Sequence, residues 1–179
     1  MTHTRCTGFT LIELMIAITL IAILVGIALP TYASAKAAVR TQELRTALLS
    51  ALNEARAAAV IHGTDTILCP SANGEHCDDG FEWQHGFIAA VDLNHNERID
   101  DTDRRLLFLT GFKDVTLLTS SGRKRIQFQP SGSNAGSNAT FTFCDERGPT
   151  HATALVMNNR GDLHNGQPSA TAIAAACRI

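Results

Sequence analysis

The sequence predicts an α+β fold in which one long N-terminal helix, first membrane-spanning and then amphipathic, packs on a mainly antiparallel β domain. Three observations support this prediction: an apolar run over residues 9–29, a helical repeat of apolar side chains over residues 31–62, and short β-branched and aromatic runs after Gly63. The 179 residues are enough for one membrane helix and one β domain with its own core.

The apolar run from Phe9 to Leu29 has the length that a helix needs to cross the hydrocarbon core. A cleaved secretory signal would have a shorter apolar core followed by small residues, whereas this run ends at Pro30 and continues as a helical pattern. A plain signal anchor gives no reason for Glu13, whose carboxylate costs roughly 2 to 3 kcal/mol inside a membrane helix. The run therefore indicates a specialised anchor in which a partner neutralises Glu13.

Pro30 stands where this helix is expected to continue. Its ring clashes with the carbonyl group of Gly26, and it has no amide hydrogen to donate. We expect a bend or a local opening there, although membrane helices also tolerate Gly and Pro without any such role.

The next stretch, residues 31–63, is predicted to continue the same helix with one face to bury. Its apolar positions recur at steps of three or four, and Gly63 is a plausible C-terminal cap. The positions expected to face the β domain are Leu44, Leu48, Leu52, Ala55 and Ala59.

Residues 64–179 are predicted to form a single β-rich domain, because turn-forming residues separate short runs of β-branched and aromatic residues. The expected strands are 64–68, 86–91, 105–109, 115–119, 126–129, 140–144 and 154–157.

The segment Gly8-Phe9-Thr10-Leu11-Ile12-Glu13 resembles the type III signal of type IV pilins and type II secretion pseudopilins. The resemblance implies that a prepilin peptidase removes residues 1–8 by cutting between Gly8 and Phe9, and that Phe9 is then N-methylated. It also implies that Glu13 meets the N-terminal amine of a neighbouring subunit, a pairing that low dielectric strengthens. The resemblance further implies that Gly26 and Pro30 belong to a region of the helix that loosens when the subunit packs in a filament.

The β domain resembles the GspH/FimT family of minor pilins and pseudopilins. The stretches that carry this likeness are 83–87, 92–96, 126–128 with Gly132, and 140–145. The resemblance implies a pilin-like fold and a structural subunit that helps to prime or cap a type IV pilus, with roles in twitching motility or adhesion. An H-type pseudopilin of the type II secretion system is the alternative. Cys144, with a second cysteine near the C-terminus, favours the pilus branch.

Arg5 precedes the apolar run, which keeps the leader in the cytoplasm and directs the β domain into the periplasm. We therefore expect a single-pass protein of the bacterial inner membrane whose partners are other pilins and the prepilin peptidase. The formal charge of −2 becomes one unit more negative when Arg5 is removed, and gives no global attraction to nucleic acid.

Five cysteines are present, of which Cys6 lies in the leader. The other four allow three pairings. We favour Cys69 with Cys77, which closes a turn-rich loop, and Cys144 with Cys177, which tethers a tail rich in Gly, Pro, Ser and Ala. Zinc is the rival explanation, but no pair has the close C-x-x-C spacing of a metal-binding loop.

Residues 92–103 place oxygen ligands at several positions of a calcium-binding loop, namely Asp92, Asn94, Asn96, Asp100 and Asp103. However, Glu97 stands where such a loop has glycine, and Asp103 where a longer glutamate is usual. We therefore favour an Asx-rich hairpin turn over a calcium site.

Some members of the resembling family bind DNA through a Gly-Arg-x-Arg motif. The corresponding region here, residues 159–164, has Asp162 and His164 in place of the arginines. Arg123, Lys124 and Arg125 form a separate basic turn that, with Arg160, is a weak candidate for phosphate contacts. A DNA-binding minor pilin in DNA uptake is therefore the second alternative, and a solvated turn is the simpler interpretation.

The sequence contains no enzyme signature. Its histidines are scattered, and no nucleophile lies in a recognisable elbow or triad motif. We expect no catalytic residues and no cofactor.

Overall fold

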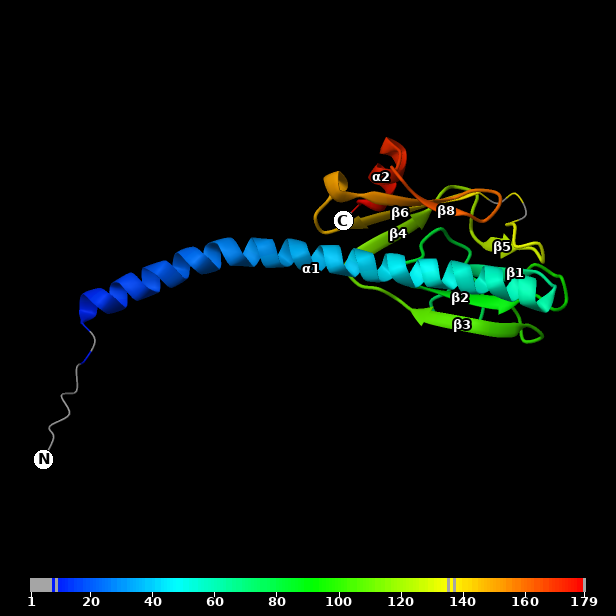
Figure 1. Cartoon of the computed structure of the whole chain (residues 1–179), viewed down its shortest axis with the longest axis horizontal. Helices are drawn as coiled ribbons and strands as arrows, with labels where there is room; N and C mark the ends of the chain where they lie inside the picture. The colour runs from blue at the N-terminus through cyan, green and yellow to red at the C-terminus, as the bar shows by residue number, and fades with distance from the viewer. Residues whose placement is uncertain (1–7, 9, 135, 137, 179) are drawn as a thin grey trace, which may run out of the picture. The chain divides into compact units, whose positions relative to one another are not determined.

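A computed structural model of the chain describes residues 8, 10–134, 136 and 138–178. The chain divides into two compact units, one ending at Lys36 and the other beginning at Ala37. Helix α1 (Leu11–His62) contributes to both, and all the strands belong to the second unit (Figure 1).

In the second unit, α1 buries the face that its sequence repeat predicts. Leu44, Leu48 and Ala55 are fully buried, and Leu52 and Ala59 lie in the same core. Gly63 ends the helix with φ 64°, and its amide donates to Ala59 O at 3.0 Å. Because glycine adopts this left-handed conformation without a steric penalty, it is a suitable C-terminal cap.

The first sheet, sheet A, is antiparallel, with the order β3-β2-β1-β5. Its strands are β1 (Thr66–Pro70), β2 (Gly86–Val91), β3 (Arg104–Thr110) and β5 (Ile126–Phe128). Every residue of β1 and β2 is buried, because one face packs in the core with α1 and the other packs against a second cluster. That outer cluster consists of Ile67, Cys69, Ile88, Ala90 and Ile99, with Cys77 against it.

The second sheet, sheet B, is also antiparallel and has the order β4-β6-β7-β8. Its strands are β4 (Val115–Thr119), β6 (Ala139–Asp145), β7 (Thr153–Met157) and β8 (Leu163–Gly166). A 3₁₀ turn, η1 (Pro149–His151), joins β6 to β7, and helix α2 (Ala170–Ala176) follows β8. The α+β prediction, with a mainly antiparallel β domain, is confirmed.

The core between the two sheets is aromatic. Trp83 meets Phe141 edge to face with 5.5 Å between ring centroids, and Phe87 lies 6.1 Å from Trp83. The indole Nε1 of Trp83 donates to Thr119 Oγ1 at 3.3 Å, so the polar atom of this buried ring is satisfied.

The tail after residue 163 is more ordered than its composition suggests. Residues 163–166 form β8, and Ser169 begins α2 by accepting a hydrogen bond from the Ala172 amide at 3.2 Å. Serine is a good N-cap, and this was the signal in the sequence for a helix that the prediction lacked.

Candidate assembly segment and interaction surfaces

The first turn of α1 carries the residues of the predicted assembly signal. The Glu13 amide donates to Thr10 Oγ1 at 3.3 Å, and the Leu14 amide donates to Thr10 O at 3.1 Å. Thr10 is therefore the N-cap and Glu13 stands at N3, the spacing of a capping box. This role was not among the sequence-based predictions, although Thr-x-x-Glu is its signature. Gly8 is exposed, and Phe9 lies outside the described residues.

A carboxylate at this position has two favourable interactions available. The positive end of the helix dipole stabilises an acid in the first turn. An amine from another subunit can pair with it as well, since Glu13 is exposed in the isolated chain. The proposed role of Glu13 in assembly is thus compatible with the position that the structure gives it.

The segment that follows Glu13 has the properties of a membrane anchor. Within the described part of the chain, α1 is the one helix long and apolar enough to cross a membrane, and none of its most apolar stretch is buried. Its hydroxyls are satisfied internally: Thr19 Oγ1 donates to Ile16 O at 2.8 Å, and Thr31 Oγ1 to Ile27 O at 3.0 Å. Such internal pairing is what a lipid environment requires.

Pro30 lies inside α1, and the helix continues through it without a break. The helix is thus not interrupted at Pro30, and the bend or local opening that we expected there stays a prediction. The amide hydrogen that Pro30 lacks would have bonded to Gly26 O, whereas the Thr31 hydroxyl donates to the next carbonyl oxygen, Ile27 O. A role for Gly26 and Pro30 in loosening the helix within a filament stays a prediction.

Two disulfides join the pairs that the sequence favoured. Cys69 is bonded to Cys77, eight positions later, and closes the loop beside β1. Cys144, in β6, is bonded to Cys177 at the C-terminal end of α2. All four cysteines are therefore in sulfur–sulfur bonds, which excludes them as zinc ligands in this state.

The Asx-rich loop between β2 and β3 is held by its own hydrogen bonds. Asp92 is buried and accepts from the amides of Asn96 (3.2 Å) and Glu97 (3.0 Å). Asp103 accepts from the amides of Leu93 and Asp100, both at 3.0 Å. Glu97 takes a positive φ of 59°, the conformation that glycine would favour at this position.

The five oxygen-bearing residues of the calcium alternative therefore meet in one turn. Hydrogen bonds from Thr102 are the largest influence on Asp100 and lower its pKa to about 2. No group of three or more His, Cys, Asp or Glu side chains that could hold a metal occurs among the described residues. The arrangement fits an Asx-rich turn, and a cation would have to compete with these internal donors.

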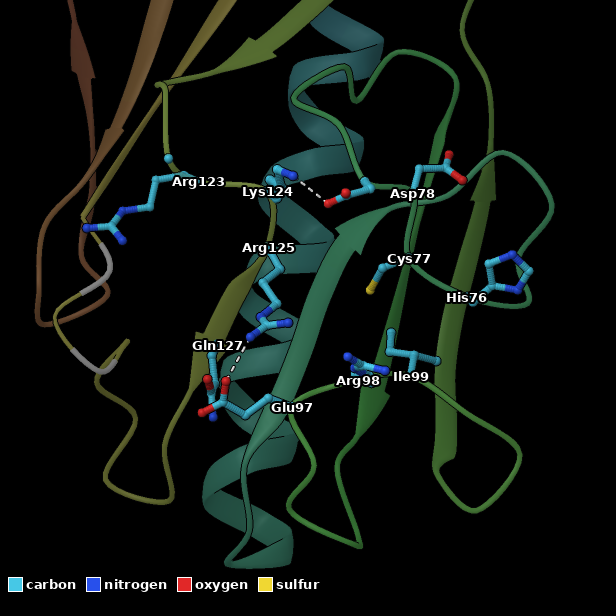
Figure 2. Close-up of a pocket in the computed structure, with 12 residues that line it drawn as sticks. His76, Cys77, Asp78, Glu97, Arg98, Ile99, Arg123, Lys124, Arg125 and Gln127 are labelled. Atoms are coloured by element: carbon cyan, nitrogen blue, oxygen red, sulfur yellow. Dashed lines mark hydrogen bonds and ion pairs between the residues drawn. The ribbon is translucent and has the colours of Figure 1, made fainter.

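A groove of about 750 Å³ lies against the outer cluster of sheet A. Three loops form it: residues 76–79 beside the first disulfide, residues 97–99 of the Asx-rich loop, and the turn 122–125 that leads into β5 (Figure 2). We call it the mixed-charge groove, because cations and carboxylates line it together. It unites Arg123, Lys124 and Arg125, whereas Arg160 lies on the turn after β7, outside the groove lining.

Of the two residues that replace the family's DNA-binding arginines, Asp162 makes hydrogen bonds within the fold. Asp162 accepts from Arg56 Nη1 at 3.5 Å and from Asn158 Nδ2 at 3.3 Å. His164 is an exposed residue of β8. The structure thus brings together three of the four candidate phosphate ligands, but not at the family motif.

A family model described as "Type II transport protein GspH" matches residues 45–161, and one described as "Prokaryotic N-terminal methylation motif" matches residues 3–29. No curated protein matches the sequence of this chain.

Two crystal structures of the type IV minor pilin FimU from Pseudomonas aeruginosa (strain PAO1) are similar to the chain. The form in space group P21 has a TM-score of 0.55 at 16% identity and covers 76% of this chain and 92% of that one. The form in space group P65 has a TM-score of 0.53 at 17% identity, covering 72% and 90%. The minor pseudopilin EpsH from the type 2 secretion system of Vibrio cholerae has a TM-score of 0.47 at 12% identity, covering 74% and 98%.

The fold, the exposed apolar helix and the methylation motif agree on one class of protein. Since the GspH model spans more than half of the chain, the chain belongs to the GspH family of pilin-like structural subunits, which are anchored in the bacterial inner membrane and assemble with other pilins, and it is not an enzyme.

Proposed function

We propose that this chain is a minor pilin that helps to prime or cap a type IV pilus, with roles in twitching motility or adhesion. The observation that carries the proposal is the Cys144–Cys177 disulfide, which tethers α2 to β6. A cysteine at position 144 together with one near the C-terminus resembles the pilus branch of the family. The FimU structures, which come from a type IV minor pilin and share this fold, support the same choice.

The proposed mechanism is assembly through the apolar helix. The prepilin peptidase cuts between Gly8 and Phe9, Phe9 is N-methylated, and the helix stays in the inner membrane until it is incorporated. Glu13 then pairs with the amine of a neighbouring subunit, because a carboxylate in a low-dielectric filament interior is stable only with a partner. The β domain determines which subunits lie beside this one.

The second candidate is an H-type minor pseudopilin of the type II secretion system. The description of the matching family model favours it, since that model is of a type II transport protein. Pilus and secretion subunits share the same assembly physics, so the choice depends on which filament contains the chain.

The deciding experiment is to tag the full chain in its native cell, cross-link it, and identify copurifying proteins by mass spectrometry. Recovery with pilus subunits, together with loss of twitching in a deletion strain, supports the proposal. Recovery with secretion subunits, together with loss of exoprotein export, makes the chain a pseudopilin. A chain that enters neither filament would overturn both candidates.

A further inference from the structure

The mixed-charge groove is lined by more cations than form ion pairs within it. Two of its cations are paired: Lys124 Nζ lies 2.6 Å from Asp79 Oδ1, and Arg125 Nη2 lies 2.7 Å from Glu97 Oε2. All four side chains are more than two-fifths exposed. Because exposed pairs contribute little to stability, a carboxylate from another molecule can replace the internal one.

The other two cations of the groove have no carboxylate partner among the described residues. Arg98 is exposed, and its side chain makes no hydrogen bond or ion pair within that set. Arg123 donates to neutral acceptors only, Asn138 O at 2.9 Å and Asn138 Oδ1 at 3.4 Å. The remaining acid, Asp78, accepts from the Ala72 amide at 2.9 Å. The groove therefore carries four cations against three carboxylates, an excess of one positive charge, and Arg98 and Arg123 are its two cations without a carboxylate partner among the described residues.

Two further features suit an extended polypeptide. Ile99, a buried member of the apolar outer cluster, and the half-buried Cys77 packed against that cluster line the groove between its charged walls (Figure 2). Gln127 of β5 lines it too, and β5 is the last strand of sheet A, so one of its backbone edges has no strand beside it in the described structure. An edge of this kind can accept an added strand from a partner.

We propose that the mixed-charge groove binds an extended acidic segment of a neighbouring filament subunit, with its carboxylates on Arg98 and Arg123 and its apolar side chains on Ile99 and Cys77. This inference rests on the proposed function, because it assumes that the chain is a filament subunit. Arginine suits the role, since its planar guanidinium group pairs with a carboxylate through two parallel hydrogen bonds.

The carboxylates of the groove favour a polypeptide over a nucleic acid. A duplex laid along the groove would bring a continuous row of phosphates against Asp78, Asp79 and Glu97. A peptide carries its negative charges singly, separated by apolar or neutral side chains, and can place them on Arg98 and Arg123, the two arginines without a carboxylate partner among the described residues.

The binding test uses the full chain in detergent and a fluorescein-labelled peptide of alternating glutamate and valine residues, measured by fluorescence anisotropy at low salt. The matched probes are the same peptide with glutamine in place of glutamate, and a short DNA duplex. We expect the acidic peptide to bind about tenfold more tightly than the glutamine peptide. The double variant Arg98→Gln/Arg123→Gln should lose about tenfold of that affinity.

The control is Arg104→Gln/Arg160→Gln, which removes the same charge from exposed positions outside the groove lining. It should bind the acidic peptide as the wild type does. Equal binding of both peptides, an equal loss in the control variant, or groove-dependent binding of the duplex in place of the acidic peptide would overturn the proposal.

Incorporation in cells separates this inference from the proposed function. We expect Arg98→Glu/Arg123→Glu to reach the inner membrane normally but to enter the filament several-fold less than the wild type. If the wild type enters no pilus or pseudopilus, the proposed function fails. If the wild type enters and the charge-reversed variant enters equally well, the proposed function stands and the groove proposal fails.

Discussion

Thr41 of α1 donates its hydroxyl hydrogen to Asp145 Oδ2 at the end of β6, joining the helix to sheet B through a buried carboxylate. Arg147 completes the arrangement, with Nε 3.0 Å from Asp145 Oδ1 and Nη2 2.7 Å from Oδ2. Asp145 is only 3% exposed. A buried carboxylate is stable only when such donors satisfy it, so the loss of one donor should be measurable.

We expect Thr41→Val to lower the free energy of unfolding by about 1 to 2 kcal/mol, because it leaves one acceptor of Asp145 without its donor. Urea unfolding of the full chain in detergent measures this, with the single tryptophan, the buried Trp83, as the fluorescent probe. Thr46→Val is the matched control, since Thr46 is an exposed residue of the same helix. Equal losses in the two variants would show that Thr41 does not support Asp145.

Acid should weaken the same contact. Burial alone would raise the pKa of Asp145, but the hydrogen bonds from Arg147 and Thr41 outweigh it and lower the pKa to about 2. A carboxyl group with a depressed folded-state pKa contributes stability that is complete above its unfolded pKa of about 4 and is lost as the pH falls toward about 2. The expected contribution is roughly 2 kcal/mol.

Unfolding measured from pH 7 to pH 2 should therefore show Asp145→Asn losing less stability on acidification than the wild type. The amide cannot titrate, so its stability is already reduced at pH 7. If the wild type and Asp145→Asn lose stability in parallel below pH 4, protonation of Asp145 does not account for the loss of stability in acid.

Local sequence patterns identified the parts of the fold that depend on near neighbours. The buried face of α1 follows from the spacing of Leu44, Leu48 and Leu52, and the strands follow from runs of β-branched and aromatic residues. The Thr41–Asp145 contact joins residues 104 positions apart, and no local pattern indicates it.

The mixed-charge groove could not be predicted from the sequence, because it too joins residues that are far apart along the chain. It is formed by three loops that follow different strands, and only the folded sheet brings Arg98 into the same groove as Arg123. The basic turn was visible in the sequence, but its carboxylate partners were not.

Removal of the two disulfides should have unequal effects. The loop closed by Cys144–Cys177 spans 33 residues, and the loop closed by Cys69–Cys77 spans eight. On the chain-entropy model, the longer bridge contributes about 3 to 4 kcal/mol and the shorter about 2 to 3 kcal/mol. Paired Cys→Ser variants, unfolded in urea, should show this order.

Hydrogen exchange gives a second measurement on the Cys144→Ser/Cys177→Ser variant. Helix α2 has only seven residues and a single buried side chain, Ala176, so it should lose protection before the strands of sheet B do. If α2 keeps its protection, its packing and not the disulfide holds it in place.

Processing should depend on the size of residue 8. We expect Gly8→Ala to be cleaved and Gly8→Leu to keep residues 1–8, because the resemblance places the scissile bond directly after this glycine. A Cβ added at position 8 meets nothing within 4 Å among the described residues, so we expect a larger residue to affect the peptidase step and not folding. The mass of the mature chain decides the outcome. Normal cleavage of Gly8→Leu would contradict the assigned bond.

Two roles of Glu13, its negative charge and its position in the capping box, can be tested separately by substitution. Glu13→Gln retains a side chain suited to N3 of the box but removes the carboxylate, whereas Thr10→Ala removes the N-cap hydroxyl and keeps the carboxylate. We expect Glu13→Gln to insert into the membrane normally and to enter the filament about tenfold less or worse, because an amine left without its partner in low dielectric costs about 3 to 5 kcal/mol.

Thr10→Ala should enter the filament nearly as well as the wild type, since the loss of a cap costs only about 1 kcal/mol. Quantitative blotting of membrane and sheared-filament fractions measures both variants. If Glu13→Gln is incorporated normally while Thr10→Ala is not, Glu13 acts by starting the helix, and selection of a neighbour's amine is not its role.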